Sequence, residues 1–198
     1  MKKIQIAVLG SSSSICTKKA YKLAEKVGEE LAKKGCTVIT GGGMGVMEAT
    51  FKGAKKAKGL TVGIIPWEST QLVNQYADVV VATGIGWSRN SINLNTCEGA
   101  IVVGGGAGTL NEATYGYMQN KPLVALSTSG GTAKFLANKY LDKRKTIKIS
   151  DAKTPKEAVN KILKLVEKDR QKDRKLSKLD QELMDLKKGG EEYIKKKK

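Results

Sequence analysis

The protein has 198 residues, and its 36 Lys and Arg against 19 Asp and Glu give a formal net charge of +17 at pH 7. It contains no histidine, which excludes a Ser-His-Asp triad, a Cys-His pair and imidazole metal ligands. Acid–base chemistry would therefore fall to carboxylates, Lys, Tyr, Cys or a cofactor. The length predicts one domain with an appendage.

The positive charge is spread along the whole chain. Residues 1–168 carry 25 basic and 12 acidic side chains, and residues 169–198 carry 11 and 7. An anionic partner, such as a nucleotide, a nucleic acid or a membrane surface, would explain this excess. Lys-rich outer helix faces of an ordinary soluble protein would explain it as well. The aromatic content of 5% is low for a base-stacking surface.

The cysteines and the hydropathy of the sequence indicate the cellular compartment of the protein. Cys16, Cys36 and Cys97 are odd in number and far apart, which predicts reduced, buried thiols in a cytoplasmic protein. No apolar run approaches 18 residues, so we expect no membrane span, and we expect no signal peptide. We also predict no metal site.

Short apolar runs alternate with longer amphipathic stretches along residues 1–168. In chain order, the predicted elements are strand 4–9, helix 18–34, strand 36–40, helix 44–58, strand 60–65, strand 78–82, helix 88–97, strand 100–103, helix 109–119, strand 123–126, helix 132–139, strand 146–149 and helix 154–168. The last helix begins with a favourable N-cap, N1 proline and acidic N3 residue at Thr154, Pro155 and Glu157. Near-continuous apolar strands followed by helices predict an α/β fold, a doubly wound, Rossmann-like parallel sheet with helices on both faces.

Residues 169–198 form a predicted C-terminal helical extension with a basic tail. Leucines at heptad-like spacing predict an amphipathic helix that packs on its own body or on a second subunit; they are Leu176, Leu179, Leu183 and Leu186. The Lys195–Lys198 tail is either a nucleic-acid arm or a solvated terminus.

Three loops rich in Gly and Ser follow predicted strands, at residues 10–14, 41–45 and 104–109. Gly permits close backbone approach, and a helix N-terminus offers unpaired N–H groups to an anion. Tight strand-to-helix turns would need Gly in any case, but three such loops at one edge predict a phosphate-bearing ligand. Neither a P-loop motif nor G-x-G-x-x-G is present, so a P-loop NTPase is excluded and ordinary NAD binding is disfavoured.

Arg89 and Glu112 are the predicted catalytic residues. Arg89 is the only Arg before Arg144, and its planar fork suits phosphate or carboxylate; the alternative is an ion pair with a neighbouring Glu. Glu112 ends a Thr109-x-x-Glu segment that also fits a capping box. An ionised Glu112 beside a phosphate could stabilise a ribosyl cation or activate water. Glu48 is a weaker candidate for the same role.

The segment Gly104-Gly105-Gly106-Ala107-Gly108-Thr109-Leu110-Asn111-Glu112 resembles the GGxGTxxE motif of the LOG-like ("lonely guy") Rossmann superfamily. Members of that superfamily were long labelled lysine decarboxylases, but nothing here marks one of the Lys for the pyridoxal phosphate that such chemistry needs. Its phosphoribohydrolase branch has PGGxGTxxE after an Arg-Lys pair, whereas this chain has Gly104 and Asn90 at those positions. Arg89-Asn90 with a glycine at 104 is more similar to the molybdenum cofactor carrier branch.

The resemblance implies a homodimer or higher homo-oligomer whose ligand is a nucleoside monophosphate or a molybdopterin-type cofactor. We expect a ligand binder or carrier; the alternatives are a nucleoside 5′-monophosphate phosphoribohydrolase, and a nucleic-acid-binding or scaffold protein. The predicted ligand contacts are Gly10, Ser11, Ser12, Gly43, Gly45, Arg89, Gly105, Gly106, Gly108 and Thr109.

Overall fold

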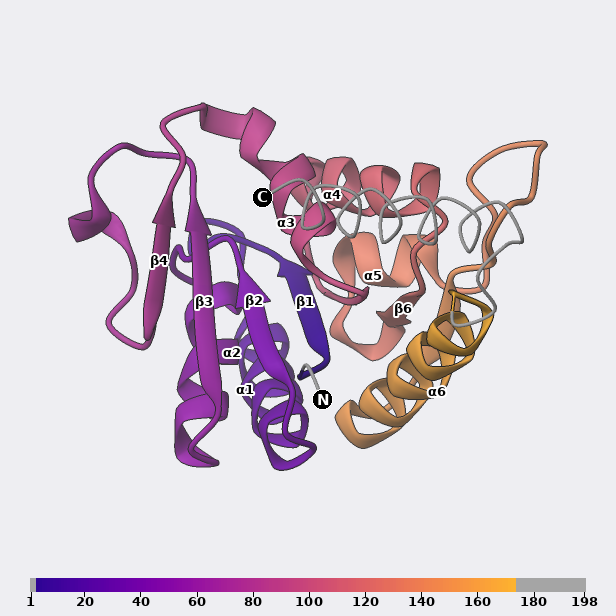
Figure 1. The fold of residues 1–198 in the computed structure, drawn as a ribbon, viewed down its shortest axis with the longest axis horizontal. Helices are drawn as coiled ribbons and strands as arrows, with labels where there is room; N and C mark the ends of the chain where they lie inside the picture. Colours follow the sequence, from indigo (N-terminus) through magenta and orange to yellow (C-terminus); the bar gives the residue numbers. More distant parts are fainter. Residues whose placement is uncertain (1–2, 174–198) are drawn as a thin grey trace, which may run out of the picture. The chain divides into compact units, whose positions relative to one another are not determined.

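A computed structural model describes residues 3–173 and contains a seven-stranded sheet of order β4-β3-β2-β1-β5-β6-β7 (Figure 1). All six pairs of neighbouring strands are parallel. The strands are β1 (Gln5–Gly10), β2 (Thr37–Thr40), β3 (Leu60–Ile65), β4 (Val79–Ala82), β5 (Gly99–Val103), β6 (Leu123–Leu126) and β7 (Ser150–Ala152). The predicted parallel α/β sheet is confirmed.

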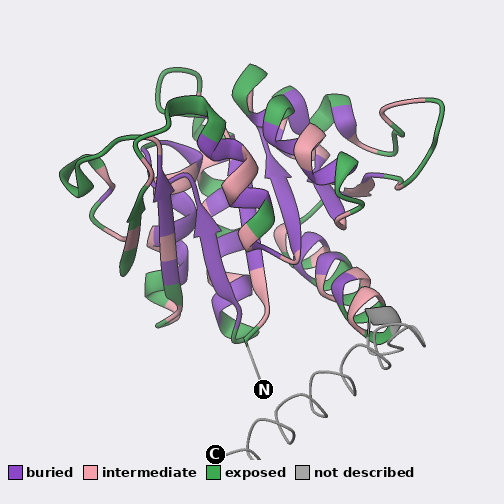
Figure 2. Ribbon diagram, turned by 45° about the horizontal axis from the view of Figure 1, so that its top comes forward, coloured by how far each residue is buried: buried purple, intermediate pink, exposed green. Residues whose placement is uncertain are grey.

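Helices cover both faces of the sheet and connect successive strands, except β3 and β4, which are joined through a 3₁₀ turn at Thr70–Leu72. The helices are α1 (Lys18–Lys33), α2 (Val46–Lys56), α3 (Arg89–Thr96), α4 (Ala107–Met118), α5 (Gly131–Leu136) and α6 (Pro155–Asp173). Helices α1 and α2 pack on one face, and α3, α4 and α5 pack on the other. On that second face, Leu94 of α3, Tyr117 of α4 and Leu136 of α5 join one buried apolar cluster. Figure 2 shows the central strands buried and β4 exposed at the edge.

The apolar runs of the central strands explain why they lie at the middle of the sheet. All five residues of β5 are buried, as are Ile6, Ala7, Val8 and Leu9 of β1. A strand that is apolar on both faces is stable only where helices cover both of them. The chain thereby fixes the carboxyl ends of β1 and β5 side by side.

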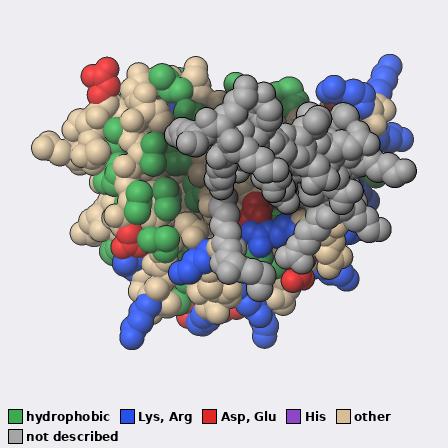
Figure 3. All heavy atoms as spheres, in the orientation of Figure 1, with side chains coloured by type: hydrophobic (Ala, Val, Ile, Leu, Met, Phe, Trp, Pro, Cys, Tyr) green, Lys and Arg blue, Asp and Glu red, His purple; other side chains and the backbone are tan. Residues whose placement is uncertain are grey.

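Strand β4 lies at the sheet edge and carries exposed apolar side chains. Its Val79 and Val81 pair in register with Val62 and Ile64 of β3, so these four side chains share one face. Val79, Val81 and Leu60 are all exposed. Figure 3 shows hydrophobic side chains gathered over β3 and β4 on this face.

One predicted strand is misplaced, and several predicted helices differ from the structure at their ends. The predicted strand 146–149 is wrong, because β7 is Ser150–Ala152. Ile149 is fully buried, and its N–H and carbonyl bond to the backbone of Lys139 and Asn138, 2.9 Å away in each case. Its apolar character reflects core packing from a loop and not a sheet ladder.

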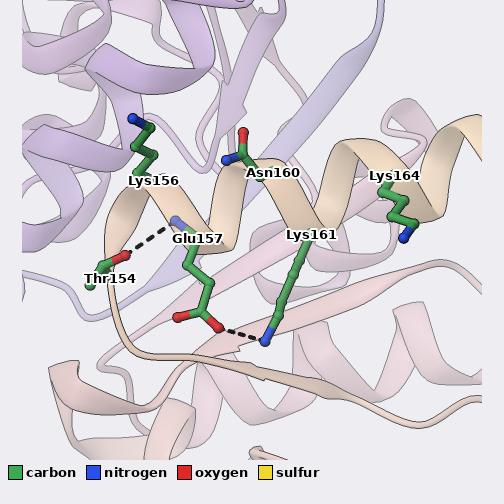
Figure 4. A pocket seen from close by; sticks show the side chains of 6 residues that line it. All are labelled: Thr154, Lys156, Glu157, Asn160, Lys161 and Lys164. Carbon is green, nitrogen blue, oxygen red and sulfur yellow. Dashed lines mark hydrogen bonds and ion pairs between the residues drawn. The ribbon is translucent and has the colours of Figure 1, made fainter.

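The last described helix, α6, begins as predicted but extends beyond residue 168, to Asp173. Pro155 is its first residue, and the Thr154 hydroxyl accepts the Glu157 N–H at 3.2 Å. The Glu157 carboxylate accepts the N–H of Lys153 and pairs with Lys161, as Figure 4 shows for the second contact. The Leu176–Leu186 seam and the lysine tail lie outside the described residues. In the described part of the chain, no helix is long and apolar enough to cross a membrane.

Candidate functional site

The three Gly-rich loops meet at one edge of the sheet because the strands before them are neighbours. They follow β1, β2 and β5, and the sheet order places β2 and β5 on either side of β1. Successive strands run outward from β1 to β4, and the chain then crosses back to add β5 on the other side of β1. Ligands of doubly wound sheets bind at such a reversal, beyond the carboxyl ends of the strands.

A cleft of about 120 Å³ opens at this reversal. Its walls are formed by the three Gly-rich loops with the adjoining starts of α2 and α4, by α3, and by the 3₁₀ turn before α3. The lining residues are Val8, Gly10, Ser11, Ser12, Ile15, Gly41, Met47, Trp87, Arg89, Asn90, Gly106, Ala107, Gly108, Thr109 and Glu112.

Arg89 is the first residue of α3, and its side chain is buried in the cleft wall. Its Nη1 lies 3.5 Å from Oε1 of Glu112, so the ion pair with a Glu, given above as the alternative to a ligand contact, is present. Its buried Nε has no hydrogen-bond partner among residues 3–173. Burial lowers the pKa of Arg89, and the nearby Glu112 partly offsets this effect. The wall of the cleft thus holds a buried cation.

Gly41 of the second loop makes room for this guanidinium. A Cβ at Gly41 would lie 2.6 Å from Nη1 of Arg89 and 2.9 Å from the sulfur of Met47. No larger residue fits without displacing Arg89 or Met47. The second loop therefore shapes the site by admitting Arg89.

Glu112 faces the cleft from the second turn of α4. Its Oε1 accepts a hydrogen bond from Nδ2 of Asn93 at 2.7 Å, in addition to facing Arg89. Burial raises the pKa of Glu112 to about 7, although Arg89 and the Asn93 hydrogen bond both act to lower it. Near neutral pH this carboxyl therefore changes between its charged and neutral forms.

The capping-box prediction for Thr109 and Glu112 is wrong. Helix α4 begins at Ala107 with Gly106 as its N-cap, and no side chain caps it. Thr109 is consequently the third helical residue, and Glu112 lies beyond the first turn. This earlier start turns the Glu112 side chain toward Arg89 and Asn93 instead of the helix terminus.

The third loop directs its carbonyl groups away from the cleft. The N–H groups of Thr132 and Ala133 donate to the carbonyls of Gly105 and Gly104 at 3.1 and 2.9 Å. The Thr132 hydroxyl donates to the carbonyl of Gly106 at 3.0 Å. With its carbonyls bound to α5, the loop presents the N-terminus of α4 to the cleft.

The first intrahelical bond of α4 runs from the Leu110 N–H to the Gly106 carbonyl at 3.0 Å. The N–H groups of Ala107, Gly108 and Thr109 precede it and have no acceptor within the helix. All three residues line the cleft. Such a helix start attracts anions through its free N–H groups and its partial positive charge.

Eight of the predicted site residues line the cleft: Gly10, Ser11, Ser12, Arg89, Gly106, Gly108, Thr109 and Glu112. Gly43, Gly45 and Gly105 are not among its lining residues. Gly45 has φ +83, and a Cβ there would lie 2.6 Å from the Ser11 carbonyl oxygen, so it joins the second loop to the first. Glu48 lines a separate hollow of about 390 Å³ with Cys16 and Tyr21.

Seven lining residues are absent from the predicted contacts: Val8, Ile15, Gly41, Met47, Trp87, Asn90 and Ala107. Trp87 carried a usable signal, because it stands two residues before Arg89 in the same short turn. Met47 and Ile15 carried none, since apolar residues in such loops usually enter the core. Cys36 and Cys97 are buried as predicted, whereas Cys16 is only partly buried.

Larger hollows lie elsewhere on the described residues, and one of about 530 Å³ is lined by Lys19, Lys134, Lys153 and Asp151 among others. Another of about 430 Å³ is lined only by residues of one segment at the start of α6, among them Lys156, Asn160 and Lys164 (Figure 4). Among the described residues, no group of three or more Cys, Asp or Glu side chains could hold a metal ion.

Known proteins resemble this chain over more than half of its length. An uncharacterized protein of Archaeoglobus fulgidus is 41% identical over 126 residues, which is 64% of this chain and 82% of that protein. A cytokinin riboside 5′-monophosphate phosphoribohydrolase of Mycobacterium tuberculosis is 35% identical over 117 residues, 54% of this chain. This chain spans only 63% of the length of that hydrolase.

The fold has solved counterparts. The structure of the molybdenum cofactor binding protein from Rippkaea orientalis is 31% identical, with a TM-score of 0.74. The match covers 84% of this chain and 99% of that one. A family model described as the SLOG cluster4 family, a LOG-like group, matches residues 3–159, which include every lining residue of the cleft. The chain belongs to the SLOG cluster4 family.

Proposed function

We propose that the protein binds a phosphorylated, nucleotide-like ligand or cofactor in the cleft at the carboxyl ends of β1, β2 and β5. The observation that carries this proposal is the convergence of the N-terminus of α4 and the Arg89 guanidinium on one small cleft. The N–H groups of Ala107, Gly108 and Thr109 bind the phosphate oxygens. Arg89, which lines the cleft, supplies the compensating positive charge.

Glu112 adjusts the charge of this site. When Glu112 is ionised, it neutralises Arg89 and repels an incoming phosphate. When it is protonated, the cleft keeps the positive charge of Arg89. Because burial raises the pKa of Glu112 to about 7, anion binding drives proton uptake by this carboxyl near neutral pH.

The proposal covers two ligand classes, nucleoside monophosphates and molybdopterin-type cofactors, which share a phosphate ester. The Rippkaea orientalis relative, a molybdenum cofactor binding protein, supports the second class. The residues of the cleft fit the phosphate of either class. The Arg89-Asn90 pair and Gly104 favour a binder over a hydrolase, since the hydrolase branch has Lys and Pro at these positions.

Calorimetric titration with AMP, GMP, ribose 5-phosphate and adenosine tests this function. We expect the three phosphate esters to bind and adenosine, which lacks the phosphate, to bind at least tenfold more weakly. Gly108→Val should abolish phosphate-ester binding, because the new side chain covers the N–H groups of α4. A Cβ at Gly108 meets nothing closer than 3.9 Å, so the variant should fold. Met118→Val, on the exposed end of the same helix, is the control and should bind normally. Equal affinity for AMP and adenosine would contradict the proposal.

The second candidate function is hydrolysis of the N-glycosidic bond of a nucleoside 5′-monophosphate. The specific observation in its favour is Glu112, a buried carboxyl with a pKa of about 7 beside a cationic donor. A pKa near the working pH suits proton transfer. In this reaction water adds at C1′, the C1′–N bond breaks, and the free base leaves with a proton. Release of adenine and ribose 5-phosphate from AMP, lost in Glu112→Gln, would establish it; no release from any monophosphate would exclude it.

A further inference from the structure

Two large apolar side chains stand exposed at the mouth of the polar cleft. Trp87 is 78% exposed and Ile15 is 58% exposed, yet both line the cleft. Tryptophan is highly buried on average in folded proteins, so a tryptophan this exposed at a binding cleft calls for a functional explanation.

Both side chains lie against the start of α4. Atom Cζ3 of Trp87 lies 3.9 Å from the position of a Cβ on Gly108, and Cδ1 of Ile15 lies 2.8 Å from that of a Cβ on Gly106. The same short segment therefore has free N–H groups and two apolar neighbours. A ligand whose anionic group meets these N–H groups must place its adjoining atoms near Trp87 and Ile15.

The cleft is large enough for only one part of such a ligand. Its volume of about 120 Å³ is well below the roughly 300–1,000 Å³ of pockets that enclose a whole organic ligand. The cleft accommodates a phosphate group, and the remainder of a nucleotide-sized ligand extends to the mouth. The side chains at the mouth therefore contact the part of the ligand that distinguishes it from inorganic phosphate.

We propose that Trp87 is a specificity residue that stacks on a planar heteroaromatic ring of the ligand, with Ile15 as a second apolar contact. This inference rests on the proposed function, since the phosphate is what positions the ring. Stacking on tryptophan recognises a π-face, so the site takes the class of purine or pterin rings and not one particular base. A ring-free phosphate ester gains nothing from Trp87.

The chain offers a direct optical test, because it has two tryptophans, Trp67 and Trp87. In Trp67→Phe, Trp87 is the only remaining tryptophan. Saturating AMP or GMP should quench its emission and reduce its accessibility to acrylamide. Saturating ribose 5-phosphate, which lacks the ring, should leave both unchanged.

Affinities of the Trp87 variants give a second readout. Trp87→Leu should weaken AMP binding by about 5- to 150-fold, the range for losing one stacked base, and leave ribose 5-phosphate binding unchanged. Trp87→Phe should restore most of the AMP affinity. Trp67→Leu is the matched control, since Trp67 is also exposed but does not line the cleft, and it should bind AMP normally.

The outcomes distinguish a failure of the stacking role from a failure of the proposed function. If AMP and ribose 5-phosphate bind and Trp87→Leu keeps AMP affinity within twofold, the stacking role is overturned and phosphate binding stands. The stacking role is likewise overturned if AMP and ribose 5-phosphate change the Trp87 emission equally. If AMP, GMP and ribose 5-phosphate all fail to bind, the proposed function is overturned, and the stacking role with it.

Discussion

The guanidinium of Arg89 lies 3.5 Å from the carboxylate of Glu112, and side-chain exposure is 6% for Arg89 and 10% for Glu112. Two effects of opposite sign act on this pair. Burial favours the neutral carboxyl, whereas the guanidinium favours the carboxylate. Because burial is the larger effect, the charge of the pair depends on pH near neutrality.

Replacing Arg89 should raise the pKa of Glu112. Arg89→Met removes the positive charge that favours the carboxylate, so the pKa of Glu112 should rise above about 7. Carbon-13 NMR of the labelled Glu side chains against pH measures it. Arg144→Met, which removes an exposed Arg paired with Asp142, should leave the Glu112 titration unchanged. A Glu112 pKa that stays constant or falls in Arg89→Met would contradict the electrostatic account.

Glu112 should make the protein less stable as the pH rises. Its pKa is raised in the folded state from 4.5 to about 7, so the folded protein binds its proton more tightly than the unfolded chain does. The stabilisation is therefore complete below pH 4.5 and is lost as the pH rises to about 7. At about 1.4 kcal/mol per pKa unit, the loss is on the order of 3 kcal/mol.

Urea unfolding between pH 4.5 and 8 measures this loss, with Glu112→Gln as the comparison. The glutamine variant keeps a neutral side chain at every pH, so the free-energy difference between variant and wild type should grow in its favour up to about pH 7. A difference that does not change with pH would show that Glu112 keeps an ordinary pKa.

Alanine at Gly41 should disturb the site, whereas alanine at Gly43 should not. A Cβ at Gly41 lies 2.6 Å from Nη1 of Arg89, but a Cβ at Gly43 meets only the flexible end of Met47, with the methyl carbon at 3.0 Å and the sulfur at 3.6 Å. We expect Gly41→Ala to weaken AMP binding by about 10- to 150-fold, the effect of losing one charge-assisted hydrogen bond. Both variants should fold, which circular dichroism checks. Equal AMP affinity in the two variants would mean that Arg89 does not need the space at Gly41.

Removing the Ser129 hydroxyl should destabilise the third loop. Its Oγ accepts the N–H of Gly104 at 2.7 Å and donates to the carbonyl of Leu126 at 2.5 Å, and the residue is buried. Ser129→Ala leaves the Gly104 N–H without its acceptor, which should cost about 1–3 kcal/mol of the free energy of unfolding. Thr128→Ala removes an exposed hydroxyl that donates to the carbonyl of Lys153. This variant should change the free energy of unfolding by less than about 0.5 kcal/mol. Losses of similar size in both variants would refute this role for Ser129.

Sequence patterns predicted the sheet well because burial on both faces leaves a strong local signal. Strand β5 was placed within one residue, since five consecutive apolar or small residues suit only a central strand. Strand β7 was missed because the apolar Ile147 and Ile149 just before it are used for core packing. Period and hydropathy do not distinguish a buried loop from a buried strand.

The site was predictable where one residue type implies one kind of contact, and not where two distant segments meet. Arg89, Glu112 and the third loop could be identified from their residue types and order. The start of α4 could not, because it depends on hydrogen bonds from Thr132 and Ala133 to the loop carbonyls. Nor could the contact of Gly41 with Arg89, which joins residues 48 positions apart.

The bonds that tie the third loop to α5 have a consequence for the proposed ligand binding. The carbonyls of Gly104, Gly105 and Gly106 already have their partners, so the loop needs no rearrangement to aim its N–H groups at a phosphate. The floor of the cleft is preorganised, and the entropic cost of ordering it falls on folding and not on binding. Adaptation to ligands of different size is left to the mouth, where Trp87 and Ile15 are largely exposed. If the proposed function holds, a rigid floor binds the phosphate and the exposed side chains at the mouth adapt to the rest of the ligand.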